Sequence, residues 1–213
     1  MITDSDKDNS VLLASGGLDS TTLAFWLIDK KISFCPVFID YGQHCAKTEL
    51  ETLINVLPSD YAKKVEVIDV SDIYKNSRSR LIDEADLWED DINYKDMYLP
   101  YRSLLLLTVG SAFSQAKGYS YLYSAFINSN HAQEIDCSTE FFEKLTKMLV
   151  DYGGVELKMP FRTKSKYEVA KIGINLKAPI GRTFSCQASS KVPCGACPNC
   201  VDRLEALKLI CSN

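Results

Sequence analysis

The sequence predicts an α/β fold: a Rossmann-like, doubly wound parallel sheet followed by a small cysteine-rich segment at the C-terminus. Three observations lead to this prediction. Short apolar runs alternate with helical patterns along most of the 213 residues, a glycine turn joins the first run to the first helical pattern, and four closely spaced cysteines come last. Ligands of such sheets gather beyond the carboxyl ends of the strands, so polar residues that follow a strand are candidates for the site.

The first predicted strand and helix flank an anion-binding turn. Residues 11–14 form an apolar run typical of a buried strand, and residues 23–27 continue a helical pattern. Between them, residues 15–22 read SGGLDSTT, in which the two glycines let the backbone N–H groups point inward and the hydroxyls add donors. The Walker and dinucleotide patterns are absent, and the turn suits a pyrophosphate. The alternative is an ordinary glycine turn capped by Asp19 or Ser20.

The next two strands are predicted at residues 33–39 and 65–68, with a crossover helix over residues 45–57. These elements form two βαβ units with the first strand. Residues 72–96 are polar, irregular and rich in Asp and Glu. We expect them to form a surface excursion, which is either a lid over the site or a solvated acidic loop without a role.

A helix is predicted to begin after residues 99–103 and to run to about residue 117, with Gly118 ending it. Residues 119–126 are predicted to form the fourth strand. Polar residues follow this strand, where they would reach the ligand edge of the sheet: Asn128, Ser129, Asn130 and His131.

The last units of the predicted sheet lie between residues 139 and 176. A helix is expected over residues 139–150 and a fifth strand near residues 155–159. Ser165 and Glu168 have the spacing of a capping box, so they indicate a helix over residues 166–176.

Composition and charge limit the classes of function. A chain of 213 residues with 46% apolar residues can bury a sizeable core. The net charge of −4 argues against a broad nucleic-acid surface, which would need a basic face. The longest apolar run is too short to span a bilayer and the acidic N-terminus does not resemble a signal peptide, so we expect a cytoplasmic protein.

Four of the eight cysteines form the pattern C-x7-C-x2-C-x2-C, with Pro and Gly bending the chain between them. Four thiolates satisfy tetrahedral zinc completely and leave no open position, so we expect a structural metal. An iron–sulfur cluster is the alternative occupant, because spacing alone does not separate the two. We expect residues 181–213 to form this segment with a C-terminal helix, and residues 1–180 to form the main domain. The expected ligands are Cys186, Cys194, Cys197 and Cys200.

Other cysteines and the histidines are expected to have structural roles. Cys35 lies in a predicted buried strand and is expected in the core, and Cys137 is expected to be structural rather than a nucleophile. His44 and His131 have no second histidine nearby in sequence, so we expect them to form local hydrogen bonds rather than bind a metal.

The turn sequence S-G-G-x-D-S resembles the PP-loop of the N-type ATP pyrophosphatases, which split ATP into AMP and pyrophosphate. Nearly the whole chain resembles the 7-cyano-7-deazaguanine synthase family, which forms a nitrile in queuosine precursor synthesis. Besides the turn, the matching positions are Asp40-Tyr41-Gly42-Gln43, Asp136-Cys137, Ser165-Lys166-x-Glu168, Ala178-Pro179, residues 183–186 and residues 193–200.

The resemblance implies roles for residues at each motif, with ATP, magnesium and zinc as cofactors. The implied ATP-binding residues are Ser15, Gly16, Gly17, Leu18, Asp19, Ser20, Phe38, Asp40, Gly42 and Gln43. The implied catalytic residues are Asp19, near magnesium, and Arg102 and Lys166, which would offset phosphate charge. The implied substrate contacts are Tyr101, Ser103, Asn128 and Asp136. The four clustered cysteines would hold zinc.

The sequence departs from the family pattern around the expected acceptor pocket. Tyr101 and Ser103 stand in a motif that is usually P-G-R-N, and His44 and Cys45 replace a basic residue and a histidine. Residues 134–135 replace the usual Tyr-Pro. Phosphate chemistry is therefore expected to be retained while the acceptor pocket is altered, as in divergent relatives that serve bacterial antiviral defence.

The expected reaction is adenylation of 7-carboxy-7-deazaguanine, followed by reaction with ammonia to give an amide and then a nitrile, and the expected assembly is a homodimer. One alternative is a ligase that joins the activated acid to an amine of a partner protein. Others are a tRNA-modifying PP-loop enzyme and a nucleotide-binding module without turnover.

Overall fold

The computed structural model describes residues 10–84, 86, 95–127 and 138–211. Its centre is a five-stranded sheet in which each neighbouring pair is parallel, in the order β3-β2-β1-β4-β5. The winding reverses between β1 and β4, so the predicted doubly wound parallel sheet is confirmed. The strands are β1 (Ser10–Leu13), β2 (Cys35–Asp40), β3 (Glu66–Asp69), β4 (Tyr121–Tyr123) and β5 (Glu156–Lys158).

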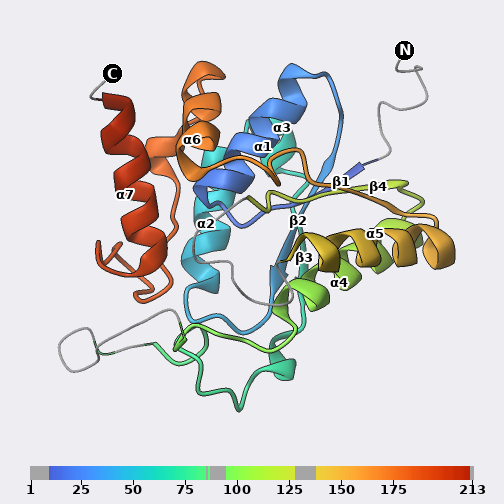
Figure 1. The fold of residues 1–213 in the computed structure, drawn as a ribbon, viewed down its shortest axis with the longest axis horizontal. Helices are drawn as coiled ribbons and strands as arrows, with labels where there is room; N and C mark the ends of the chain where they lie inside the picture. The colour runs from blue at the N-terminus through green and yellow to red at the C-terminus, as the bar shows by residue number, and fades with distance from the viewer. Residues whose placement is uncertain (1–9, 85, 87–94, 128–137, 212–213) are drawn as a thin grey trace.

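Helices cover both faces of the sheet. Figure 1 shows α4 and α5 on one side and α1, α6 and α7 on the other. The helices are α1 (Leu18–Asp29), α2 (Ala46–Val56), α3 (Ser59–Ala62), α4 (Arg102–Ala116), α5 (Thr139–Gly153), α6 (Lys166–Asn175) and α7 (Pro198–Cys211), with two 3₁₀ helices, η2 (Ser71–Ile73) and η4 (Ile180–Arg182).

Side chains of the central strands alternate between two cores. Leu12 and Phe38 pack on the face that carries α1, α2 and α6. Val11, Val37 and Ile39 pack on the face that carries α4 and α5. Because both faces are covered, the interior positions of β1 and β2 form continuous apolar runs rather than alternating with polar residues, and only Ser10 and Asp40 at the strand ends are polar.

Local sequence signals set most helix ends where they were predicted. The capping box of α6 is present: Glu168 N–H donates to Ser165 Oγ, and Ser165 N–H donates to a Glu168 carboxylate oxygen. Gly118, with a φ of +79°, follows α4 as expected. Helix α5 extends three residues beyond its predicted end, to Gly153, where Gly154 takes the left-handed conformation.

Strand β4 is shorter than the predicted residues 119–126. Tyr119 N–H donates to Ser114 O at 2.8 Å, so the chain is still completing the turn after α4. Ser124 N–H donates to Lys158 O at 3.0 Å, and the residues after it leave the sheet. The apolar run therefore forms the strand with its residues 121–123 and the wall of a cavity with residues 124–126.

The predicted surface excursion over residues 72–96 is only partly at the surface. Leu81 is buried and packs, with Leu99, against Tyr41 and Cys186. Arg80 N–H donates to Asp96 O at 2.7 Å, so the end of the excursion is joined to its first half. Three of its eight acidic residues fall outside the described residues, and its role as a lid stays a prediction.

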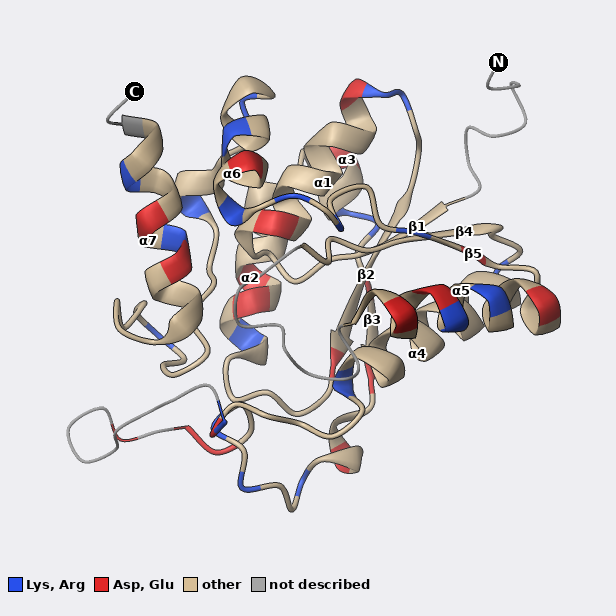
Figure 2. Ribbon diagram, in the orientation of Figure 1, with Lys and Arg blue, Asp and Glu red and all other residues tan. Residues whose placement is uncertain are grey.

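Charged residues are mixed over the surface helices. Figure 2 shows Asp and Glu among Lys and Arg along α5 and α7. Neither helix presents a continuous basic face of the kind that binds a phosphate backbone. Within the part of the chain that the structure describes, no helix has the length and apolarity to cross a membrane.

The turn between β1 and α1 lies directly against two other segments. Gly16 has a φ of +74°, and a Cβ atom at this position would lie 2.7 Å from the Glu49 carbonyl oxygen and 2.7 Å from the Leu53 nitrogen, both on α2. Gly16 O also accepts a hydrogen bond of 3.2 Å from Phe184 N–H. The absence of a side chain at Gly16 is therefore what allows α2 to pack beside the turn.

Replacing Gly16 by Ala should destabilise the fold by about 3 kcal/mol, because backbone strain adds to an overlap with backbone atoms of α2. The matched control is Gly118→Ala, where φ is +79° but nothing lies within 4 Å of the added Cβ. That variant should lose only about 1 kcal/mol. Urea unfolding measures both, and equal losses would show that the close approach to α2 is unimportant.

Candidate functional site

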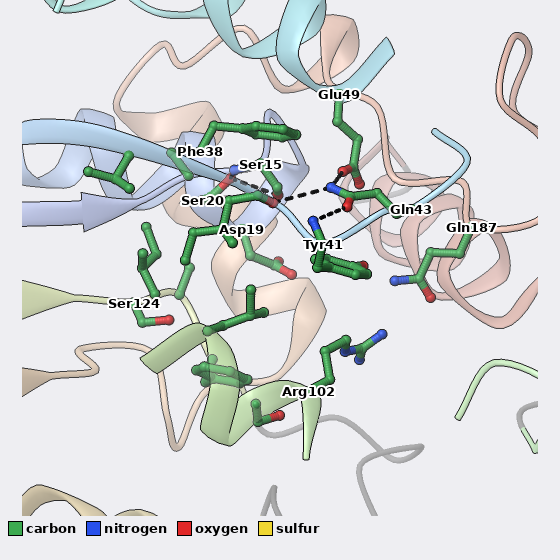
Figure 3. A pocket seen from close by; sticks show the side chains of 18 residues that line it. Ser15, Asp19, Ser20, Phe38, Tyr41, Gln43, Glu49, Arg102, Ser124 and Gln187 are labelled. Atoms are coloured by element: carbon green, nitrogen blue, oxygen red, sulfur yellow. Dashed lines mark hydrogen bonds between the residues drawn. The ribbon is translucent and has the colours of Figure 1, made fainter. Parts of the chain in front are cut away.

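A cavity of about 300 Å³ opens at the carboxyl ends of β1, β2 and β4. This is the switch point of the sheet, where the fold class predicts a ligand. Figure 3 shows its lining, which consists of Leu13, Ala14, Ser15, Asp19, Ser20, Val37, Phe38, Ile39, Tyr41, Gln43, Glu49, Arg102, Ser103, Leu106, Ser124, Ala125, Phe126 and Gln187.

The glycine turn forms one wall of this cavity. Ser15 N–H donates to Ser20 Oγ at 3.3 Å, and Ser20 Oγ donates to Gly17 O at 3.3 Å, so the hydroxyls hold the turn closed. Helix α1 begins at Leu18 with Gly17 as its N-cap, and no described side chain caps it. Its first-turn N–H groups and positive dipole end are therefore suited to an anion.

The predicted ATP-binding residues divide into two groups. Ser15, Asp19, Ser20, Phe38 and Gln43 line the cavity, and their contact with ATP stays a prediction. The others shape the backbone behind it: a Cβ atom at Gly16 would meet α2, Leu18 is in the core, and Asp40 Oδ1 accepts the Gly42 N–H. This second group is Gly16, Gly17, Leu18, Asp40 and Gly42.

Asp19 and Lys166 form an ion pair at the edge of the turn. Lys166 Nζ lies 2.6 Å from Asp19 Oδ2, and the two side chains are 15% and 23% exposed. They lie 147 residues apart in sequence, on α1 and α6. Asp19 Oδ1 is buried and has no hydrogen-bond partner among the described residues. A group that has lost water without gaining a partner is suited to a cation or a donor from a ligand.

Of the four predicted substrate contacts, one lines the cavity, one lies outside it, and two are not among the described residues. Ser103 is buried in the cavity wall beside Arg102. Tyr101 is 71% exposed, with a φ of +57°, and does not line the cavity. Asn128 and Asp136 lie outside the described residues.

Glu49 is a cavity residue that the sequence did not single out. It lies in α2, and its Oε2 accepts a hydrogen bond of 3.0 Å from Gln43 Nε2. Burial of the carboxyl group raises the pKa of Glu49 to about 7, although the Gln43 and Cys45 hydrogen bonds and the Arg102 charge oppose this. A carboxyl group with such a pKa exchanges protons at neutral pH.

Ser124 and Gln187 were also missed. Ser124 follows β4 directly, so its place at a strand end was an available signal. Gln187 has no such signal, because it reaches the cavity only when its segment folds back over α2. His44 Nε2 donates to Gln187 O at 3.1 Å, so His44 does form a hydrogen bond, but with a residue 143 positions away rather than with a local partner.

The four predicted metal ligands come together. Their sulfur atoms all lie within 4.8 Å of one another, and Cys186, Cys197 and Cys200 are buried. Cys194 N–H donates to Cys186 Sγ at 3.4 Å and Cys197 N–H donates to Cys194 Sγ at 3.2 Å, as in backbone turns that wrap a thiolate metal site. Four convergent thiols fit a tetrahedral ion, so the cluster could hold a metal such as zinc.

The segment that carries these cysteines is fastened to α2. Thr48 Oγ1 donates to Ser190 O. Ser190 in turn donates from its N–H and its hydroxyl to the two carboxylate oxygens of Glu84, at 2.6 and 2.9 Å.

Cys35 was expected in the core but is only partly buried, because it is the first residue of β2, at the exposed amino end of the sheet.

Arg203 holds the residues that connect α6 to the cysteine cluster. It belongs to α7, and its partly buried guanidinium group has a pKa lowered by burial. The Phe184 N–H, in the same connecting segment, donates to Gly16 O, so the segment that Arg203 holds also contacts the glycine turn. The oxygens that Arg203 contacts belong to Ile180 (2.7 Å), Gly181 (3.4 Å), Thr183 and Ser185 (3.5 Å).

The raised pKa of Glu49 predicts a pH dependence of stability. Between pH 4.5 and about pH 7 the folded state binds more protons at this group than the unfolded state, so its contribution falls as pH rises through this window. Glu49→Gln should therefore become more stable relative to the unmodified protein as pH rises, by at most about 3 kcal/mol. Urea unfolding at several pH values measures the difference.

The control is Glu51→Gln, an exposed position on the same helix, which should leave the pH dependence unchanged. If Glu49→Gln and the unmodified protein follow parallel curves, the carboxyl group of Glu49 is not buried as described.

Comparison with known proteins places these features in a family. The family described as "Queuosine biosynthesis protein QueC" matches residues 9–211. A 7-cyano-7-deazaguanine synthase of Methanospirillum hungatei is 32% identical over 209 residues, which cover 94% of this chain and 95% of that protein. A second, from Picrophilus torridus, is 28% identical and covers 92% of this chain and 85% of its own length.

The fold also has a counterpart among solved structures. A 4-thiouridine synthetase, solved as an RNA complex with bound ATP, aligns with a TM-score of 0.51 and 14% identity, over 94% of this chain and 50% of the synthetase. At that identity the likeness concerns the fold alone. The family match, in contrast, spans nearly the whole sequence. The chain therefore belongs to the queuosine biosynthesis QueC family.

Proposed function

We propose that this protein is an ATP-dependent 7-cyano-7-deazaguanine synthase. It adenylates the carboxylate of 7-carboxy-7-deazaguanine, releases pyrophosphate, and uses ammonia to form the amide and then the nitrile. The observation that carries the proposal is the ion pair of Asp19 and Lys166, which lies at a glycine turn beside an open cavity. The names of the relatives support this choice of product.

Activation is needed because a carboxylate is a poor electrophile. Its negative charge repels nucleophiles, and its oxygen is a poor leaving group. Attack of the carboxylate on the α-phosphorus of ATP removes both obstacles, since pyrophosphate departs and the acid becomes an acyl adenylate. In the second round the amide oxygen attacks ATP in the same way and then leaves with AMP, while the nitrogen loses its protons and becomes the nitrile.

The residues of the cavity can stabilise this transfer chiefly by position and charge. The glycine turn and the start of α1 present N–H donors to the departing pyrophosphate. Arg102 lines the cavity and Lys166 is paired with Asp19 at its edge, so both supply positive charge. Asp19 Oδ1, which has no partner in the described part of the chain, suits a magnesium ion, which would supply Lewis-acid stabilisation of the phosphate oxygens.

A partner-protein amine is the second candidate acceptor. Tyr101 is 71% exposed and adjoins Arg102, so an exposed aromatic side chain lies next to the cavity wall, within reach of a partner protein. A tRNA acceptor has less support, since acidic and basic residues are mixed along α5 and α7. Mass spectrometry of intact co-expressed candidate proteins separates the two acceptors, because only the partner-protein route leaves a covalent adduct.

Purified protein incubated with ATP, magnesium, 7-carboxy-7-deazaguanine and ammonium should release AMP and pyrophosphate. Lys166→Met and Asp19→Asn should each lower the rate by at least about 100-fold, because each removes charge aimed at the transferring phosphate. The control Lys144→Met removes an exposed lysine that pairs with Glu140 on α5, and should keep the rate. Quantifying AMP by chromatography checks all three.

Absence of acid-dependent AMP would reject the proposed reaction. ATP binding without AMP release would instead indicate a nucleotide-binding module without turnover.

We further propose zinc as the occupant of the cysteine cluster. Metal analysis should find about one zinc per chain, and Cys200→Ser should lose it and lower the melting temperature by roughly 5–10 °C, because a four-thiolate site contributes to folding. Cys35→Ser, outside the cluster, should keep the metal. Iron with visible absorbance in the purified protein would point to an iron–sulfur cluster instead.

A further inference from the structure

The cavity holds two carboxyl groups in different surroundings. Asp19 is paired with the ammonium group of Lys166. Glu49 lies across the turn on α2 and is bound by an amide rather than by a lysine. Figure 3 shows Glu49 reaching toward Gln43, above Tyr41 and Arg102. Two carboxyl groups held apart in this way can serve different steps of one reaction.

Gln43 fixes the direction of the Glu49 carboxyl group. The Gln43 side chain is buried, its Oε1 accepts the Tyr41 N–H at 2.9 Å, and its Nε2 donates to Ile39 O at 3.4 Å. Both ends of the amide are therefore tied to the backbone after β2. The remaining contact of Nε2, with Glu49 Oε2, orients the carboxyl group without neutralising it.

Charged and titratable groups face Glu49 from each neighbouring element. Arg102 on α4 favours the ionised carboxylate, and Asp40 at the end of β2 disfavours it. The Cys45 thiol before α2 hydrogen-bonds to Glu49, and Tyr41 lies on the other side of Gln43. Burial exceeds the favourable contributions and brings the pKa of Glu49 to about 7. A general base works best when its pKa lies near the working pH.

We propose that Glu49 is the general base of the amide-forming step, a role that rests on the proposed function. Ammonia attacks the acyl carbon of the adenylate and a C–N bond forms. The attacking nitrogen loses one proton to the Glu49 carboxylate, the C–O bond to the phosphate breaks, and AMP leaves with the electron pair. The same residue would accept the proton of any amine that takes the place of ammonia.

The test separates adenylation from amide formation in Glu49→Gln. Exchange of labelled pyrophosphate into ATP, in the presence of the acid, reports adenylation and should fall far less than the later step. Ammonium-dependent amide formation should fall about 100-fold or more, the usual contribution of a general base. Hydroxylamine is much less basic than ammonia, so its nitrogen loses the proton to water more readily after it attacks the acyl carbon, and hydroxamate formation should be largely restored in the variant.

The pH profile gives a second readout. The rate of amide formation by the unmodified protein should rise with pH, with an apparent pKa near 7. This inflection of the pH profile should be absent in Glu49→Gln. Glu51→Gln, exposed on the same helix, is the matched control and should keep both the rate and the profile. Glu49→Asp retains a carboxylate one methylene further back and should retain part of the rate.

Three results overturn the proposal. Glu49→Gln could form amide at the normal rate, or lose exchange and amide formation equally, or fail to recover with hydroxylamine; the last two would make Glu49 a structural residue. Absence of pyrophosphate exchange in the unmodified protein would instead reject the proposed function itself, and the role of Glu49 would fall with it.

Discussion

The close approach of backbones at Gly16 is the constraint on which the site depends. The left-handed conformation at this residue turns the chain away from β1, and the missing side chain lets α2 lie against the turn. That packing brings Glu49 to the cavity, because the carbonyl oxygen of Glu49 is one of the α2 backbone atoms that lie against Gly16. On the other side, the Gly16 carbonyl accepts the Phe184 N–H. One glycine thus joins three segments that are far apart in sequence.

The same arrangement explains the distribution of charge. An anion-binding turn needs donors and cations, yet it lies near two carboxyl groups that would repel a phosphate. Lys166 offsets the charge of Asp19 directly. Glu49 is treated differently: burial shifts its equilibrium toward the neutral acid, so it adds less negative charge at neutral pH than an exposed carboxylate would. The cavity is therefore suited to an anionic ligand while keeping a group able to take up a proton.

Much of the fold could be predicted because its signals are local. The apolar runs of β1 and β2, the capping box at Ser165 and the stop at Gly118 each depend on a few neighbouring residues. The cysteine cluster also follows from spacing. The length of β4 did not follow, because its apolar run continues into the cavity wall. Leu81 was placed in a surface loop because its burial depends on a distant partner segment.

The candidate site was predictable where a motif contributed the residue and unpredictable where packing did. Asp19 and Lys166 were named from two motifs, and the structure pairs them. Glu49 was missed because one glutamate in a helical pattern looks like any solvated residue. Gln187 was missed because its position depends on contacts of His44 and Thr48 with the cysteine segment.

These contacts give the cysteine cluster a part in the cavity. Gln187 adjoins Cys186 and lines the cavity, while Ser190 is held by Thr48 and Glu84. Arg203, three residues after Cys200, holds the segment whose Phe184 contacts the glycine turn. A metal that fixes the four sulfurs would hold in place both the segment that carries Gln187 and the helix that carries Arg203. Its effect on catalysis would then be exerted through the shape of the cavity, since four thiolates leave the ion no open position for substrate.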